Sequence, residues 1–253
     1  MCRHLAWLGR PRSLADLVLS GPHSLLVQSY RPREQRYGTL NADGFGVGWY
    51  SAARPQPARY RRSQPIWTDS SFASLAGVVG AGCALAAVRS ATAGMPMDES
   101  ATAPFTAGPW LFSHNGSIDD VAALRSVLPP GTAVESAVDS ALIWALLLHR
   151  LHAGQPLPEA LVAVVLATTA VTSGRVNLLA TDGEQVVATR WGDTLYVRSS
   201  QDGLAIASEP GATGIEDGWQ LVPDRSLVVA DRDGLRIAAV STPVVEGAAS
   251  GAG

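Results

Sequence analysis

The sequence VNLLATDGEQVVATRWGD, residues 176–193, decides the fold of the second half of the chain. Two short apolar runs rich in valine are joined by Asp182-Gly183, a dipeptide typical of tight hairpins between antiparallel strands. Further runs of the same kind follow, with turns that also contain glycine: TLYVRSSQDG, LAIASEPG, SLVVADRDG and LRIAAVS. The sequence therefore predicts a series of short antiparallel strands that extends to about residue 240.

The first part of the chain combines strands with helices. Continuous apolar runs predict strands at 2–8, 45–50, 83–90 and 110–117, the last running into a turn. Helices are expected at 13–20, 69–75, 118–127, 135–152 and 156–167, and long loops at 30–45 and 91–109. Because the main helices lie between two groups of strands and do not alternate with single strands, we predict an α+β fold.

Chain length and composition favour one globular domain. The chain has 253 residues, 47% of them hydrophobic, and a net charge of -3, which suits one large core. No internal repeat or linker divides it. We predict a domain over residues 2–242 and a disordered tail over 243–253, where small residues dominate.

Several classes of function are disfavoured. Lysine is absent, and the 19 arginines are scattered apart from RYRR at 59–62, which is too short for a nucleic-acid surface. The apolar runs are too short to span a bilayer, and no export signal is visible, so we expect a cytoplasmic protein. Two cysteines, Cys2 and Cys83, are too few for a disulfide framework or a metal site. We expect neither a metal nor a cofactor, and oligomeric state is not predicted.

Four stretches carry groups suited to chemistry: Cys2, VRSAT at 88–92, SHNG at 113–116 and AVDSALI at 137–143. Each also has an ordinary structural explanation. An arginine that ends a strand is usually a surface charge, Asn-Gly is common in tight turns, and an aspartate in the first turn of a helix interacts favourably with the helix dipole. Only the combination and order of the four stretches favour a functional interpretation.

Together with NADGFGVGWY at 41–50, these stretches resemble the class II glutamine amidotransferases, whose catalytic domain is an N-terminal nucleophile hydrolase. The resemblance covers about residues 2–240. It is strongest to a subgroup that hydrolyses a γ-glutamyl amide in ergothioneine biosynthesis. The resemblance implies a four-layer αββα sandwich with two antiparallel sheets. One departure is Arg3, because many members of the family have glycine directly after the cysteine.

The resemblance also implies a role for each matching residue. Removal of Met1 would make Cys2 the first residue, with its α-amine as general base for its own thiol. Asn115 and Gly116 would hold the oxyanion through a side-chain amide and a backbone N–H. On the substrate, the glutamyl α-carboxylate would be bound by Arg89 and Thr92 and the α-ammonium by Asp139.

Three functions fit this pattern. The first is a free-standing hydrolase of a small-molecule γ-glutamyl amide, and the second is a glutaminase subunit that supplies ammonia to a separate synthase. The third is a non-enzymatic interaction module, which is disfavoured because every expected chemical position is filled. No separate catalytic histidine is required, and His4 and His114 are expected to be structural.

Overall fold

The strands form two sheets in the computed structural model, which describes residues 2–92, 94–211 and 218–240. The first sheet has seven strands in the order β11 (Trp219–Leu221), β9 (Tyr196–Ser200), β10 (Gly203–Ala207), β1 (Arg3–Ser13), β4 (Gly80–Val88), β2 (Phe45–Ser51) and β3 (Arg54–Arg62). The second has six, in the order β13 (Gly234–Ala239), β12 (Ser226–Asp231), β8 (Val186–Arg190), β7 (Gly174–Thr181), β6 (Trp110–Ile118) and β5 (Phe105–Ala107). All of these strand pairs are antiparallel.

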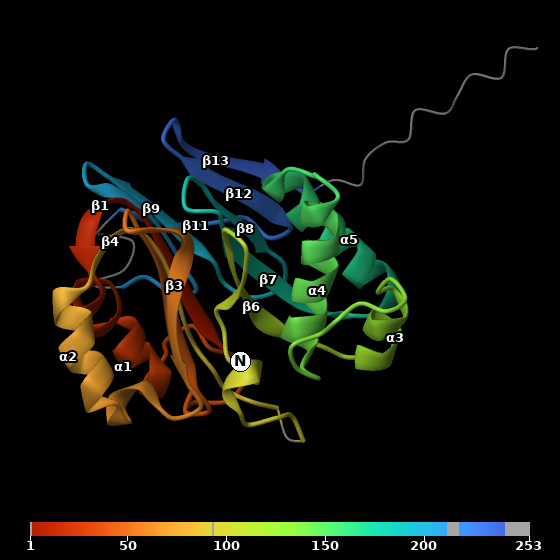
Figure 1. Cartoon of the computed structure of the whole chain (residues 1–253), viewed down its shortest axis with the longest axis horizontal. Coiled ribbons are helices and arrows are strands. Elements are labelled where there is room, and N and C mark those ends of the chain that lie inside the picture. Colours follow the sequence, from red (N-terminus) through yellow and green to blue (C-terminus); the bar gives the residue numbers. More distant parts are fainter. Residues whose placement is uncertain (1, 93, 212–217, 241–253) are drawn as a thin grey trace, which may run out of the picture.

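Helices cover the outer face of each sheet (Figure 1). The first sheet is covered by η1 (Ala15–Leu19), α1 (Leu25–Tyr30) and α2 (Ser70–Val78), and two short turns, η2 (Ile66–Thr68) and η3 (Glu99–Ala101), lie in its connections. The second sheet is covered by α3 (Val121–Ser126), α4 (Asp139–His152) and α5 (Leu157–Val171). These layers confirm the predicted α+β sandwich with two antiparallel sheets.

An apolar core joins the two sheets. It includes Ala6 of β1 and Leu85 of β4 from the first sheet, and Leu111 and Leu179 from β6 and β7 of the second. Side chains alternate along a strand, so neighbouring residues on β1 face opposite sides. Trp7 belongs to a separate apolar cluster with Tyr196 and Trp219 on the other face of the first sheet. His4 shares the inner face with Ala6, whereas Arg3 points to the helical layer.

The hairpins predicted from the turn residues are confirmed. Strand β7 pairs with β8, β9 with β10, and β12 with β13. The helix expected at 69–75 begins after Asp69, whose carboxylate accepts a hydrogen bond from the N–H of Phe72 at 2.9 Å. The helix expected at 13–20 is shorter and spans Ala15–Leu19, because β1 continues to Ser13. Helix α1 lies just before the predicted loop at 30–45 and was not predicted.

The strand predicted at 110–117 is confirmed, but the ordinary explanation of Asn115-Gly116 as a tight turn is wrong. Both residues lie within β6, which continues to Ile118, and they pair with Asn177 and Val176 of β7. Close packing explains the glycine, because a Cβ on Gly116 would lie 1.8 Å from the carbonyl oxygen of Arg175. A side chain therefore cannot be accommodated at this position.

Four further predictions concern the loop at 91–109, the tail, the limit of the domain and the location of the protein. Within the predicted loop at 91–109, the structure places η3 and β5. The tail predicted at 243–253 lies outside the described residues, so it and the limit of the domain at residue 242 stay predictions. None of the described helices has the length and apolar character needed to cross a membrane, and the cytoplasmic location also stays a prediction.

Candidate active site

Cys2 lies directly before β1, the strand at the middle of the first sheet. Strand β1 is held on one side by β10 and on the other by β4, with Arg3 opposite Val88. The thiol of Cys2 is free and partly exposed. The two flanking strands fix the backbone that follows Cys2, and the thiol faces a pocket between the sheets.

This pocket brings together five of the six predicted site residues. Its lining includes Cys2, Arg89, Thr92, Gly116 and Asp139. The cavity has a volume of about 40 Å³, small beside the ~300–1,000 Å³ of typical ligand pockets. It can therefore take only one end of a substrate, and the rest must lie outside it.

Arg89 follows β4 and is 7% exposed. Its guanidinium donates to two backbone carbonyls, those of Pro96 at 2.8 Å and Asp43 at 3.5 Å. Within the described ranges, no carboxylate lies within the 4.0 Å that defines an ion pair with Arg89. A buried arginine that lines a pocket and has no carboxylate in ion-pair contact is suited to bind an anion.

Asp139 is the first residue of α4 and is 8% exposed. One carboxylate oxygen accepts from the N–H of Ile118 at 3.2 Å, and the other from the N–H of Ser140 at 2.7 Å. Here too, no cationic group of the described chain lies within ion-pair distance. The carboxylate is thus held in place by neutral donors and keeps acceptor capacity for a cation. Thr92 is exposed and lies on the lining of the same pocket.

Asn115 is the one predicted residue that does not line the pocket. Its side chain is fully buried and points to the opposite face of β6 from His114 and Gly116. The amide Nδ2 donates to Ser208 Oγ at 3.2 Å, whereas Oδ1 has no hydrogen-bond partner. The structure therefore places Asn115 beside the pocket, next to a lining residue, and leaves one of its two amide N–H groups available.

Neither nearby histidine is arranged to activate Cys2. Burial, together with the positive charges of Arg3 and His114, lowers the pKa of His4 to about 3, so His4 is neutral near pH 7. Its Nδ1 lies 3.3 Å from Ser113 Oγ. His114 Nε2 donates to the carbonyl of Arg175 at 3.0 Å, and its Nδ1 lies 3.0 Å from Ser140 Oγ. Both rings are held by structural hydrogen bonds.

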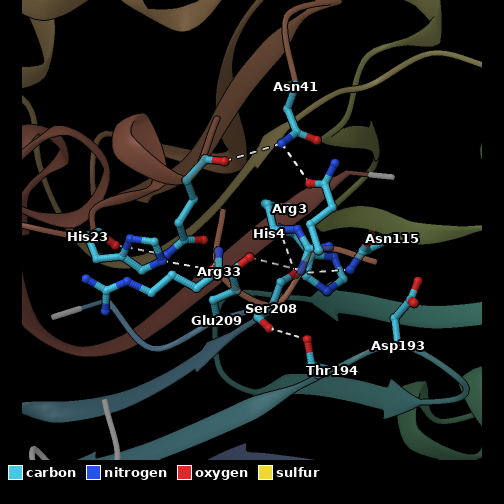
Figure 2. Close-up of polar contacts among 12 residues, drawn as sticks. Arg3, His4, His23, Arg33, Asn41, Asn115, Asp193, Thr194, Ser208 and Glu209 are labelled. Carbon is cyan, nitrogen blue, oxygen red and sulfur yellow. Dashed lines mark hydrogen bonds and ion pairs between the residues drawn. The ribbon is translucent and has the colours of Figure 1, made fainter. Parts of the chain in front are cut away.

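Figure 2 shows a buried polar network around Arg3 and Glu209, which was not predicted. Arg3 and Glu209 are both fully buried, with Arg3 Nη1 3.4 Å from Glu209 Oε1. The other carboxylate oxygen accepts from His23 Nε2 and from the N–H of Arg33, each at 2.8 Å. Burial alone would raise the pKa of Glu209, but these two hydrogen bonds and the charge of Arg3 outweigh it and lower the pKa. The sequence carries little sign of this network: Arg3 begins one apolar strand, and Glu209 follows another.

The described residues contain no group of three or more His, Cys, Asp or Glu side chains that could hold a metal ion. The second thiol, Cys83, is buried in β4 and lies 3.3 Å from Thr181 Oγ1. Burial raises the pKa of Cys83 to about 12. Of the two thiols, only Cys2 faces a site with groups suited to chemistry.

Comparison with known proteins identifies the class. Residues 17–204 match the model of the class II glutamine amidotransferases, and the chain belongs to this family. The family predicted from the sequence is therefore confirmed. The matched range begins after Cys2, so the predicted nucleophile lies outside it.

Curated relatives are similar over nearly their whole length. The chain is 50% identical over 231 residues to the gamma-glutamyl-hercynylcysteine sulfoxide hydrolase of Mycolicibacterium smegmatis, covering 90% of this chain and 95% of the relative. It is 45% identical over 240 residues to the protein of the same name from Mycobacterium tuberculosis, covering 95% of this chain and 97% of the relative.

A solved structure supports the fold. The glutamine phosphoribosylpyrophosphate amidotransferase from B. subtilis superposes with a TM-score of 0.70 at 14% identity, covering 96% of this chain and 50% of that chain. At this identity the similarity concerns the fold alone, and it agrees with the observed sandwich.

Proposed function

We propose that this protein is a cysteine-dependent amidohydrolase that cleaves γ-glutamyl-hercynylcysteine S-oxide to hercynylcysteine S-oxide and glutamate, a step of ergothioneine biosynthesis. The named relatives at 45–50% identity support this substrate. The two buried charges at one pocket carry the proposal. Arg89 and Asp139 have opposite charges and no ionic partner in the described part of the chain, and both line the pocket that holds Cys2.

A γ-glutamyl group supplies both missing partners. Its free α-carboxylate suits the guanidinium of Arg89, and its α-ammonium suits the carboxylate of Asp139. The small volume of the pocket, about 40 Å³, fits the recognition of this end of the substrate. The leaving group would then lie outside, where the described pocket imposes little restriction.

In the proposed reaction, removal of Met1 leaves Cys2 with a free α-amine, a group whose ordinary pKa is about 7.7–8.0. The amine accepts the thiol proton, and the sulfur attacks the γ-carbonyl carbon to form a tetrahedral intermediate. The oxyanion is held by the N–H of Gly116 and the free amide N–H of Asn115. Collapse transfers the proton to the leaving amine and forms a γ-glutamyl thioester, which water hydrolyses to glutamate and free Cys2.

The experiment is a matched assay of glutamate release from γ-glutamyl-hercynylcysteine S-oxide and from L-glutamine. We expect kcat/KM to be at least about tenfold higher for the sulfoxide, because both substrates share the glutamyl end and only the sulfoxide has a large leaving group that can make further contacts outside the pocket. A preference for L-glutamine would instead support a glutaminase subunit. Failure to release glutamate from either substrate would contradict the amidohydrolase.

A further inference from the structure

Ser208 follows β10 and makes contact with both strands that carry the proposed chemistry (Figure 2). Its Oγ accepts a hydrogen bond from the backbone N–H of His4 at 3.0 Å, two residues after Cys2. The same oxygen accepts from Asn115 Nδ2 on β6 at 3.2 Å. One hydroxyl therefore joins the nucleophile strand of the first sheet to the proposed oxyanion amide of the second.

The amide of Asn115 depends on this contact. Oδ1 is buried without a partner, and Ser208 Oγ is the hydrogen-bond partner of Nδ2 among the described residues. An amide nitrogen has two N–H groups. With one N–H held by Ser208, the direction of the other is fixed, and that second N–H is the one available to an oxyanion.

The position of Ser208 does not depend on its hydroxyl. Its backbone N–H donates to the carbonyl of His4 at 2.9 Å, and its carbonyl accepts from Thr194 Oγ1 at 2.9 Å. The next residue, Glu209, forms the ion pair with Arg3 beside Cys2. These contacts persist when the hydroxyl is removed, so an alanine at 208 would lose the bonds to His4 and Asn115 and little else.

We propose that Ser208 is a positioning residue that fixes the Asn115 amide relative to the Cys2 strand and so sets the geometry of the oxyanion site. The inference rests on the proposed function, because it takes Cys2 as nucleophile and Asn115 as oxyanion donor. Ser208 acts through Asn115 and does not line the substrate pocket.

The kinetic test compares Ser208→Ala with Thr194→Val, using glutamate release from a γ-glutamyl amide. Thr194→Val removes a buried hydroxyl that bonds the same residue, but through its backbone carbonyl. We expect Ser208→Ala to lower kcat about tenfold with KM within about twofold, as for a supporting residue that orients a reacting group. Thr194→Val should leave kcat within about twofold. Equal losses in the two variants would overturn the proposal, since the effect would then be structural.

A double-mutant cycle tests the route of the effect. In an Asn115→Ala background, Ser208→Ala should change kcat by less than about twofold, because the amide that Ser208 orients is already gone. A full tenfold loss in that background would show that Ser208 acts independently of Asn115 and would overturn the proposal.

A measurement without turnover separates this proposal from the proposed function. The chain contains three asparagines, Asn41, Asn115 and Asn177. Protein labelled with ¹⁵N-asparagine therefore gives three side-chain amide pairs by NMR, assigned by Asn115→Ala. Ser208→Ala should shift the Asn115 pair, and Thr194→Val should leave it in place. An unchanged Asn115 pair in Ser208→Ala would overturn the positioning role even in an enzyme with full activity. A shifted pair in a protein that cleaves no γ-glutamyl amide would support the contact and reject the function.

Discussion

The two cysteines lie at opposite ends of the space between the sheets. Cys83 of β4 is opposite Leu8 of β1, near a hollow of about 600 Å³ that is also lined by Tyr50. Cys2 lies at the other end, beside a cavity of about 40 Å³. The larger hollow has the weaker chemistry, because burial raises the pKa of both Cys83 and Tyr50 and keeps them protonated near pH 7. The proposed active site at the Cys2 end therefore rests on its charged residues and accessible thiol, and cavity volume does not support it.

The largest expected effect is the difference in activity between variants that lack one or the other thiol. Cys2→Ala should abolish glutamate release, because it removes the atom that forms the covalent intermediate, while Cys83→Ala should retain activity within about twofold. Steady-state assays on both purified variants provide the measurement. Residual activity of Cys2→Ala above about one hundredth of wild type would point to another nucleophile.

Chemical labelling compares the same two groups without substrate. Because burial raises the pKa of Cys83 to about 12, this thiol is almost entirely protonated at pH 7. Iodoacetamide should therefore modify Cys2 alone in the folded protein, as read by peptide mass spectrometry. The thiolate fraction of Cys83 rises about tenfold for each pH unit below its pKa, so labelling of Cys83 should appear only on strong alkalinisation or unfolding. Equal labelling of both thiols at pH 7 would contradict the expected difference in reactivity between Cys2 and Cys83.

Asn115→Ala should lower kcat by roughly 10²–10³, the usual loss for one oxyanion donor, with little change in KM. The reason is that the amide contact strengthens mainly in the transition state. Steady-state kinetics decide the matter: an effect confined to KM would place Asn115 in ground-state binding.

Conservative substitutions of Arg89 and Asp139 test the two charged residues at the Cys2 end that have no ion-pair partner among the described residues. Arg89→Lys keeps the positive charge but loses the planar fork, and Asp139→Asn keeps the shape but loses the charge. Each should lower kcat/KM by about ten- to a hundredfold, since one end of the zwitterion loses its partner. Wild-type enzyme should likewise discriminate against N-acetylated or α-amidated γ-glutamyl substrates. If blocked and parent substrates were cleaved at equal rates, Arg89 and Asp139 would not bind the charged groups of the glutamyl end.

The smallest expected effect is on stability at the Cys83 end. Cys83→Ala removes a buried sulfur and its contact with Thr181, and should lower the free energy of unfolding by about 1 kcal/mol. Urea denaturation monitored by tryptophan fluorescence measures it. A large loss of activity without a loss of stability would show that the far end of the sandwich takes part in the reaction.

Local signals explain how much of the fold the sequence predicts. Asp182-Gly183 predicted the β7–β8 hairpin, and the apolar runs predicted most strands and helices. The placement of β1 between β4 and β10 has no local signal, because these partners come from distant parts of the chain. The ordinary explanation of Asn115-Gly116 as a tight turn fails for a related reason: the carbonyl of Arg175, contributed by β7, requires glycine there.

The candidate site divides in the same way. Arg89, Thr92, Gly116 and Asp139 were selected by resemblance and lie on one pocket with Cys2, although their roles stay predictions. Ser208 and Glu209 were not predicted to belong to the site, because a serine and a glutamate after a strand usually lie at the surface. Only the folded chain reveals that both are fully buried against the residues that follow Cys2.

The placement of β1 also has a practical consequence for anyone who makes this protein. Because β4 and β10 flank the strand on both sides, the backbone after Cys2 cannot swing away to make room. Any residue attached ahead of Cys2 would begin at the cavity of about 40 Å³ and would convert the α-amine that we propose as base into a non-basic amide. A protein with an N-terminal affinity tag should therefore fold well but be catalytically inactive. Purification handles belong at the C-terminus, or must be cut by a protease that leaves cysteine first.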